Sequence, residues 1–505
     1  MNPTAEKSPS APIGRKHAMV LQMVGGYVNT AIVIVQGLLL IPLYLHFIGA
    51  HLYGLWMASG GILGMLGVLN FGVGNMLIQR VANAYGKRDL SKAGANFVNG
   101  MFVYLIIVCT FVIFGLLLSF FFPLLLKVPS ELNNQLRGCF QLAVIAAGAG
   151  LINECLRSFA QALLRPLFSM VTMALCRILG IAITVILLYK GAGLWAIPIG
   201  MLVAEIFILI ASLFQTVALF KELHTIISLE STIIKEYFKL GGAMFMARLG
   251  SALSRESDPL LITFFLRPEL TTAYMLTRKA ADIVFQMLSV IVGASHSAFS
   301  HLVGHGHKEK TAEIATKLVA MVFVLGLIGF VPYVMMNHSF VTLWVGEAFA
   351  LNQMLILMVG IAFFANSLRN IVWQILNGLG DYQDSSRIIF AEGIAKVLLA
   401  AVLLNYMGLL GVPLAMVVTS SIAMVALAVK LLSHVKLSIS KQKIVYAFAM
   451  AIILFGLSAY FAGMVHTTSW NSFALVSSMV VIGIIMLCAS ANWSNFRLLI
   501  KGYLK

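Results

Sequence analysis

The fold is decided by the stretch FMARLGSALSRESDPLLITFFLRPELTTAYMLTRKAAD, which runs from Phe245 to Asp282. It consists of two apolar segments, and long runs of Leu, Ile, Val, Phe and Gly flank it on both sides. Its two apolar segments carry Arg248, Arg255, Glu256, Asp258, Arg278, Lys279 and Asp282. An ionised side chain in the core of a bilayer costs at least ~2.5–3.5 kcal/mol. We therefore expect these charges to face a protein interior or a water-filled cavity that the rest of the chain builds.

The composition is that of an integral membrane protein. Of the 505 residues, 60% are hydrophobic and 10% are charged, and the mean hydropathy is +0.97. Ordinary globular domains are about 25% charged. A net charge of +16 would indicate nucleic-acid binding in a soluble protein. In a membrane protein the location of the charges matters more than their sum, so no nucleic-acid partner is expected.

The five cysteines do not form a metal or disulfide pattern. Cys109, Cys139, Cys155, Cys176 and Cys488 stand singly, without C-x-x-C or Cys/His spacing. We therefore expect no disulfide framework, no metal site and no cofactor.

Apolar windows of about 20 residues predict an all-α polytopic protein with about fourteen transmembrane helices. The expected parts are a cytoplasmic tail (1–17), an N-lobe of six helices (18–220), a linker (221–238), a C-lobe of six helices (239–434), two further helices (435–492) and a basic tail (493–505). The linker is amphipathic, which suits either a hinge between lobes or a helix lying at the headgroups.

Basic residues fix the orientation. With a cytoplasmic N-terminus, the outer segments hold only Lys127, Arg137, Lys190 and Arg267, and most other basic residues outside the spans fall on inner segments. The positive-inside rule then places both termini in the cytoplasm.

A weak internal repeat supports two lobes. Gly25–Gly26 matches Gly241–Gly242, and Arg157 matches Arg369, with offsets of about 210 to 220 residues. The matches run in the same direction with the same parity of spans. This predicts parallel lobes related by an axis along the membrane normal.

Two motifs resemble those of a known family. The opening IPLYLHFIGAHLYGLWMASGGILGMLGVLNFGVGNMLIQRVANAYGKRD, from Ile41 to Asp89, contains the turn L-N-F-G-x-G-N at Leu69 to Asn75. The inner loop ILNGLGDYQDSS spans Ile375 to Ser386. Both resemble Wzx-type polysaccharide flippases of the multidrug/oligosaccharidyl-lipid/polysaccharide (MOP, MATE-like) exporter superfamily.

The resemblance implies a fold, a cargo and a location. It implies two six-helix lobes around a central cavity, in the cytoplasmic (inner) membrane of a bacterium. The cargo would be a polyprenyl-pyrophosphate-linked glycan such as an O-antigen, capsule or exopolysaccharide unit. The expected partners are this glycan, membrane lipids and the polysaccharide polymerase or chain-length machinery. The family's usual acidic residue is Asn70 here, so no proton or sodium role is carried over to that position.

The helix around residue 250 is expected to carry a polar stripe. At 100° per residue, Arg248, Ser251 and Arg255 lie within about 60° of one another, with Asp258 some 80° from Arg248. Arg248 and Arg255 would lie about 13 Å and 24 Å into a core of ~30 Å. An Arg fork suits pyrophosphate oxygens, so both are candidate substrate ligands.

Local pairing offers an alternative role for several of these charges. Arg278 and Asp282 are spaced i,i+4, as are Glu392 and Lys396, and Arg157 has Glu154 at i−3. Asp258 and Asp282 are candidates for ion pairing or coupling. The remaining candidate substrate ligands are Arg157, Arg278, Lys279 and Arg369, of which Arg369 has no acid nearby in its own span.

Uncharged polar residues and one lone acid complete the candidate site. Glu205 is a single carboxylate in its span and suits a coupling proton or sodium ion, although a hydrogen-bonded neutral Glu fits equally well. The candidate sugar contacts are Asn29, Gln36, Asn70 and Asn75, and helix–helix hydrogen bonding would explain them as well.

The leading interpretation is a lipid-linked oligosaccharide flippase that works by alternating access through a cationic cavity. A multidrug cation antiporter of the same superfamily is the alternative, but it would call for an acidic cavity. A membrane glycosyltransferase or polymerase is more distant, because its outer loops would need more than the isolated Glu131, Glu269 and Glu347. We therefore expect a transporter and not an enzyme.

Overall fold

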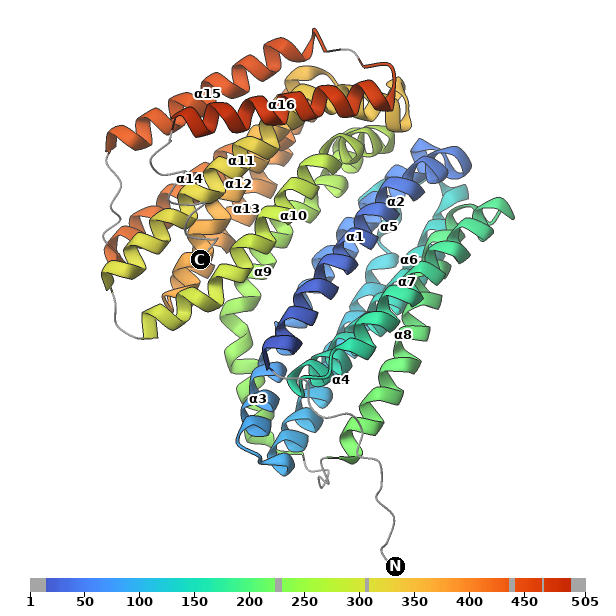
Figure 1. Ribbon diagram of the computed structural model, residues 1–505. Helices are drawn as coiled ribbons and strands as arrows, with labels where there is room; N and C mark the ends of the chain where they lie inside the picture. The colour runs from blue at the N-terminus through green and yellow to red at the C-terminus, as the bar shows by residue number, and fades with distance from the viewer. Residues whose placement is uncertain (1–14, 223–228, 305–307, 436–440, 466, 492–505) are drawn as a thin grey trace, which may run out of the picture. The chain divides into compact units, whose positions relative to one another are not determined.

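The computed structural model describes residues 15–222, 229–304, 308–435, 441–465 and 467–491, which form helices joined by short connections, with no strand in these ranges (Figure 1). The predicted all-α class is confirmed. The first eight helices are α1 (Arg15–Ile48), α2 (Ala50–Leu66), α3 (Val73–Gly86), α4 (Leu90–Ser119), α5 (Phe122–Leu126), α6 (Ser130–Ala162), α7 (Leu167–Tyr189) and α8 (Ala196–Lys221). The others are α9 (Ser231–Phe265), α10 (Pro268–Gly304), α11 (Lys308–Val345), α12 (Gln353–Gly378), α13 (Tyr382–Met407), α14 (Gly411–His434), α15 (Lys441–Ala462) and α16 (Trp470–Ala491).

Within the described residues, 11 helical segments are long and apolar enough to cross a membrane. One of them, Tyr382–His434, has 53 residues and contains both α13 and α14, so it is long enough for two crossings. The charge-bearing helices α9 and α10 are not among the 11. A multi-pass membrane protein is therefore confirmed, and the count of about fourteen spans stays a prediction.

The motif at Leu69–Asn75 breaks a helix. Between α2 and α3 lies a 3-10 turn, η1 (Gly67–Asn70), followed by Phe71 and Gly72 with φ of 50° and 72°. The side-chain Oδ1 of Asn70 accepts a hydrogen bond of 2.8 Å from the Gly72 N–H. A left-handed residue pair ends a helix, and Gly adopts this conformation without a Cβ penalty. One apolar run of the sequence thus becomes two helices.

The chain divides into two compact units. The first contains Met1–Leu52 and Leu66–Phe245, and the second contains Tyr53–Met65 and Met246–Lys505. Two helices therefore contribute to both units: most of α2 groups with the second, and the first turns of α9 group with the first. Part of the predicted linker 221–238 lies outside the described residues, and its end, from Ser231, is the beginning of α9.

In the first unit, α6 packs against α3, α4 and α8, and α7 packs against α1 and α8. The core is aromatic and aliphatic. Phe97 stacks on Phe159 with ring centroids 4.0 Å apart, and the fully buried Tyr237 of α9 belongs to the same core. The guanidinium of Arg80 lies over the Tyr237 ring and pairs with Glu236. These contacts fix the beginning of α9 in the first unit.

In the second unit, α12 is the central helix and packs against α10, α11 and α14, while α15 and α16 lie along α11 (Figure 1). The ring of Phe340 on α11 stacks on Trp344 of the same helix and meets the rings of Trp470 and Phe473 on α16. The two predicted C-terminal helices are thus present as helices packed on the outside of this unit.

Helices α9 and α13 cross in backbone contact. A Cβ atom added to Gly250 would lie 2.3 Å from the carbonyl oxygen of Ile389, and one added to Gly393 would lie 2.2 Å from that of Gly250. Only glycine permits so close an approach. The crossing brings the polar residues that follow Gly250 and Gly393 next to each other.

Candidate functional site

Four charged residues of Phe245–Asp282 meet in an ion-pair network in the second unit, and they are Arg255, Asp258, Arg278 and Asp282. The centre is Arg278 on α10, whose Nη1 lies 2.9 Å from Oδ2 of Asp258 on α9. Its Nε and Nη2 donate to Asp282 over 3.0 and 3.2 Å, which confirms the predicted i,i+4 pair. The side chains of Arg278 and Asp258 are only 4% and 2% exposed. Arg278 is therefore held by two carboxylates and is inaccessible to a ligand in this structure.

Lys396 on α13 is the second partner of Asp258. Its Nζ forms an ion pair with Asp258 Oδ1 and donates to the Ser257 hydroxyl over 3.1 Å, and its side chain is 0% exposed. The expected pairing of Lys396 with Glu392 is wrong. The crossing at Gly250 and Gly393 places Lys396 against α9 instead, so an interhelical partner replaces the local one.

Glu392 binds Arg369 of α12. The Arg369 Nε lies 3.3 Å from Glu392 Oε2, with side chains 3% and 1% exposed, and the Ser420 hydroxyl of α14 donates to Oε1 over 2.7 Å. Arg369 Nη2 also donates to Asn366 Oδ1 over 2.5 Å. Arg369, which has no acid in its own helix, thus has one on a neighbouring helix.

Arg255 is the most accessible cation of the network. Its side chain is 28% exposed, its Nη2 lies 3.7 Å from Asp282 Oδ1, and its Cζ lies 4.7 Å from the centre of the Phe285 ring. Its Nε is buried and has no hydrogen-bond partner in the described part of the chain. A distance of 3.7 Å exceeds a normal hydrogen bond. The guanidinium therefore makes no normal hydrogen bond to Asp282, although its side chain remains partly exposed.

Arg248 of α9 and Lys279 of α10 are both half-buried in the second unit. Whether Arg248 and Arg255 face a central cavity stays a prediction.

The two acids of the first unit bind amides. Asn70 Nδ2 donates to Glu154 Oε2 over 2.8 Å, and Asn153 Nδ2 donates to Glu205 Oε2 over 2.7 Å. Within the described residues neither acid has an ion pair, so the alternative pairing of Glu154 with Arg157 does not form. Asn153 is 1% exposed and its Oδ1 has no described partner.

The other predicted residues of the first unit are more dispersed. Arg157 donates to the carbonyl oxygen of Asn153 over 3.3 Å and its Nη1 contacts the sulfur of Met173. Asn29 Oδ1 accepts a hydrogen bond of 2.6 Å from Arg177, which agrees with a helix–helix role. Gln36 is half-buried and Asn75 is exposed.

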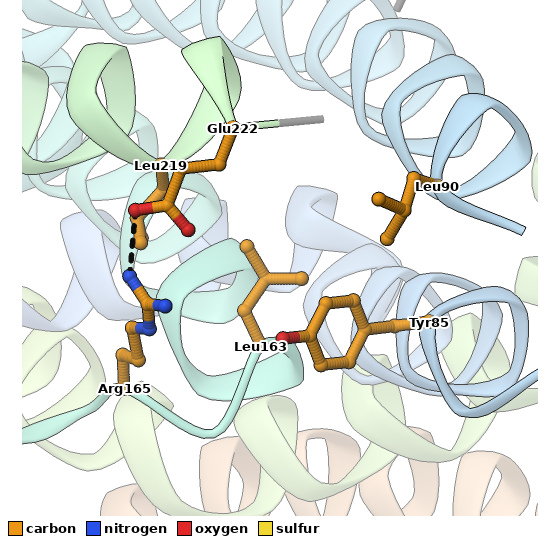
Figure 2. A pocket seen from close by; sticks show the side chains of 6 residues that line it. All are labelled: Tyr85, Leu90, Leu163, Arg165, Leu219 and Glu222. Atoms are coloured by element: carbon orange, nitrogen blue, oxygen red, sulfur yellow. Dashed lines mark hydrogen bonds and ion pairs between the residues drawn. The ribbon is translucent and has the colours of Figure 1, made fainter. Parts of the chain in front are cut away.

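One pocket in the first unit lies between the ends of α3, α4, α6 and α8 (Figure 2). Tyr85 and three leucines line it, and at one side Arg165 Nη1 lies 2.8 Å from Glu222 Oε1. Its volume is about 100 Å³, whereas ligand pockets usually measure about 300–1,000 Å³. None of the predicted site residues line it, and a lipid-linked glycan would not fit. In the described residues no three His, Cys, Asp or Glu side chains could hold a metal ion.

Sequence reasoning missed Ser257, Ser420 and Asn153 as partners of buried charges. The contact of Ser257 with Lys396 had one indication in the sequence. Gly250 and Ser257 share a face of α9, and Gly393 precedes Lys396 by about one turn of α13. A glycine in each of two apolar helices is compatible with a close crossing, but the sequence does not say which helices cross.

Known proteins place the chain in a family. Residues 62–352, more than half of the chain, match the family model described as polysaccharide biosynthesis protein. No curated protein sequence matches.

Three solved structures illustrate the fold. The lipid II flippase MurJ in an inward closed conformation has a TM-score of 0.64 at 12% identity, covering 93% of this chain and 99% of that one. An inward-facing multidrug resistance MATE transporter of the MOP superfamily has a TM-score of 0.61 at 14% identity, covering 86% and 98%. A MOP superfamily transporter from Pyrococcus furiosus has a TM-score of 0.55 at 15% identity, covering 86% and 93%.

At 12–15% identity the similarity to these structures shows the fold alone, and the match to the family model shows the family. The resemblance predicted from the motifs at Ile41–Asp89 and Ile375–Ser386 is confirmed at both levels. The chain belongs to the polysaccharide biosynthesis protein family and has the fold of MOP superfamily transporters.

Proposed function

We propose that this protein is a transporter that flips a polyprenyl-pyrophosphate-linked oligosaccharide from the inner to the outer leaflet by alternating access. The cargo would be an O-antigen, capsule or exopolysaccharide unit, and the membrane the cytoplasmic membrane of a bacterium. Membership of a polysaccharide biosynthesis family and a fold shared with a lipid II flippase support this proposal.

The observation that carries the proposal is the state of Arg255. The network holds three cations, Arg255, Arg278 and Lys396, against two carboxylates, Asp258 and Asp282. Arg255 is the most exposed of the three cations, and at 3.7 Å its ion pair is the longest in the network. Guanidinium groups bind phosphate oxygens through two parallel N–H donors. An anionic pyrophosphate headgroup is the ligand that such a group suits best.

The roles of the predicted cations then separate. Arg278 and Arg369 are buried and held by carboxylates, so we assign them to the structure of the second unit. Arg255 is the primary substrate ligand. Arg248, Lys279 and Arg157 stay secondary candidates, because they are half-buried but do not share the geometry of Arg255.

A cation antiporter is the second candidate. Glu154 and Glu205 of the first unit bind amides and have no ion pair among the described residues. Such carboxylates suit a cationic cargo or a coupling ion better than the neutralised acids of the second unit do. A transport assay has to test both cargoes.

The experiment uses inverted membrane vesicles that carry labelled polyprenyl-pyrophosphate oligosaccharide. We compare wild type with Arg255→Ala and Arg255→Lys at matched membrane abundance, and measure the glycan protected inside the vesicles. A hydrogen bond to a charged group contributes ~1.5–3 kcal/mol, so Arg255→Ala should transport roughly 10-fold more slowly or worse. Arg255→Lys should recover little, because Lys lacks the planar fork.

Arg387→Ala is the matched control, since Arg387 is an arginine of the same unit whose side chain is 68% exposed. Its transport should equal that of wild type. Transport at the wild-type rate by both Arg255 variants would refute the substrate contact. Failure of wild type to protect the glycan, together with uptake of a cationic drug, would favour the antiporter.

We also propose that both termini are cytoplasmic and that the protein works beside the polysaccharide polymerase or chain-length machinery. The basic residues of the inner segments support the orientation. Periplasmic phosphatase fused at the C-terminus should be inactive, and an active fusion would reverse the orientation.

A further inference from the structure

Lys396 places a complete charge in the interior of the second unit. Its side chain is 0% exposed, and its Nζ meets Asp258 Oδ1 and the Ser257 hydroxyl. Lys is a compact point charge that is strongly hydrated in water. Burial removes that hydration, so the two oxygens of α9 have to replace it.

Asp258 needs this particular cation. Arg278 is shared between Asp258 and Asp282, so one positive charge lies between two negative ones. Arg255 pairs with Asp282 and not with Asp258. The counter-charge specific to Asp258 is therefore the ammonium of Lys396, which is supplied by α13.

The surroundings of the ammonium are those of a small-cation site. A carboxylate oxygen and a hydroxyl oxygen are the ligand type that hard cations prefer. Ser257 is 2% exposed and Asp258 is 1% exposed, so the oxygens are screened from bulk water. The Ser257 hydroxyl also donates to the carbonyl oxygen of Leu253 over 2.6 Å, which turns its lone pairs toward Lys396.

We propose that Asp258 and Ser257 form a monovalent-cation site that the ammonium of Lys396 permanently occupies as an intramolecular ligand. The second unit therefore needs no sodium, potassium or ammonium ion from solution. Removing the ammonium while keeping the length of the apolar stem opens the site to such an ion. The inference concerns ion binding by the folded protein and is independent of the cargo.

The test variant is Lys396→Met, because Met ends where the Lys Cε lies and leaves the space of Nζ vacant. Purified wild type and variant are heated in choline chloride, with sodium chloride or ammonium chloride replacing it at constant ionic strength. Wild type should unfold at the same midpoint in all three salts. The variant should unfold at a lower midpoint in choline and rise with sodium or ammonium to saturation, by roughly 2–4 °C or more. Equilibrium dialysis with labelled sodium should find binding to the variant and none to wild type.

The double variant Asp258→Asn/Lys396→Met tests whether Asp258 is the ligand. It should fold, because both charges are removed together, and its midpoint should not depend on the cation. A single variant that fails to accumulate in membranes while the double variant accumulates would support the counter-charge role. The proposal is overturned if the unfolding midpoint of Lys396→Met responds to the cation no more than that of wild type. It is also overturned if the double variant responds as strongly as Lys396→Met, or if neither of these two variants accumulates in membranes.

Discussion

The carboxylates within the helices have different partners in the two units. In the first unit, Glu154 and Glu205 accept hydrogen bonds from Asn70 and Asn153. In the second unit, Asp258, Asp282 and Glu392 each face an Arg or Lys. The first arrangement uses neutral amide donors, whereas the second uses cationic side chains within ion-pair distance.

The difference determines what happens to each acid's neighbours if the acid is replaced by its amide. When both partners of an ion pair are buried, removing the charge of the acid is costly, because the cation is then left without a counter-charge in a low-dielectric interior. An acid held by an amide keeps a hydrogen-bond partner when it gains a proton, because the amide has both a donor and an acceptor. The carboxylates of the second unit are thus tied to fixed cations, whereas those of the first unit are held by neutral amides.

The strongest way to break this comparison is Asp258→Asn. The change leaves Lys396 buried without a counter-charge and removes one partner of Arg278. Breaking a buried ion pair by removing one partner costs about 3–5 kcal/mol. We expect little folded protein, measured by fluorescence-detected size exclusion and by thermal unfolding in detergent.

Asp384→Asn is the control for that change. Asp384 pairs with Lys430 and Arg387, but its side chain is 53% exposed. Exposed ion pairs contribute little to stability, so this variant should unfold like wild type. If Asp258→Asn also unfolds like wild type, the acids of the second unit are not structural.

A smaller effect is expected from Gly393→Ala. The new Cβ would lie 2.2 Å from the Gly250 carbonyl oxygen, so α9 and α13 must move apart and Lys396 with them. Overpacking of this kind costs roughly 1–3 kcal/mol. Gly456→Ala in α15 is the matched control, because nothing lies within 4 Å of its new Cβ. Thermal unfolding should distinguish the two, and an equal midpoint would show that the crossing yields without strain.

The sequence predicted what depends on local order. Apolar runs predicted the helices, and the spacing of Arg278 and Asp282 predicted their ion pair, because residues four apart lie on one face. The motif around Asn70 is identified in the sequence as a turn, but periodicity alone cannot report the left-handed backbone of Phe71 and Gly72 that forms it.

The sequence could not predict pairs between helices. Lys396 and Asp258 are 138 residues apart, and the nearer acid Glu392 has the spacing of a local partner. Lys396 pairs with Asp258 because the backbone contact of Gly250 and Gly393 brings α13 against α9, and this contact depends on tertiary packing. The same holds for Arg369, which has no acid in its own helix and binds Glu392 of the next.

Glu205→Gln is the change that should disturb the fold least and sharpen the comparison most. Gln has the shape of Glu, and its amide oxygen can accept the hydrogen bond that Asn153 donates over 2.7 Å. We expect stability to change by no more than ~1 kcal/mol, because one hydrogen bond is exchanged for another. Glu392→Gln is the matched change in the second unit, and there the buried Arg369 would lose its counter-charge, so it should destabilise the protein far more.

If Glu205 binds the coupling ion, Glu205→Gln vesicles should also transport at a rate that no longer responds to a proton or sodium gradient. Equal losses of stability in the two variants would mean that amide-held and ion-paired acids serve the same structural purpose, and a preserved gradient response would remove Glu205 from coupling.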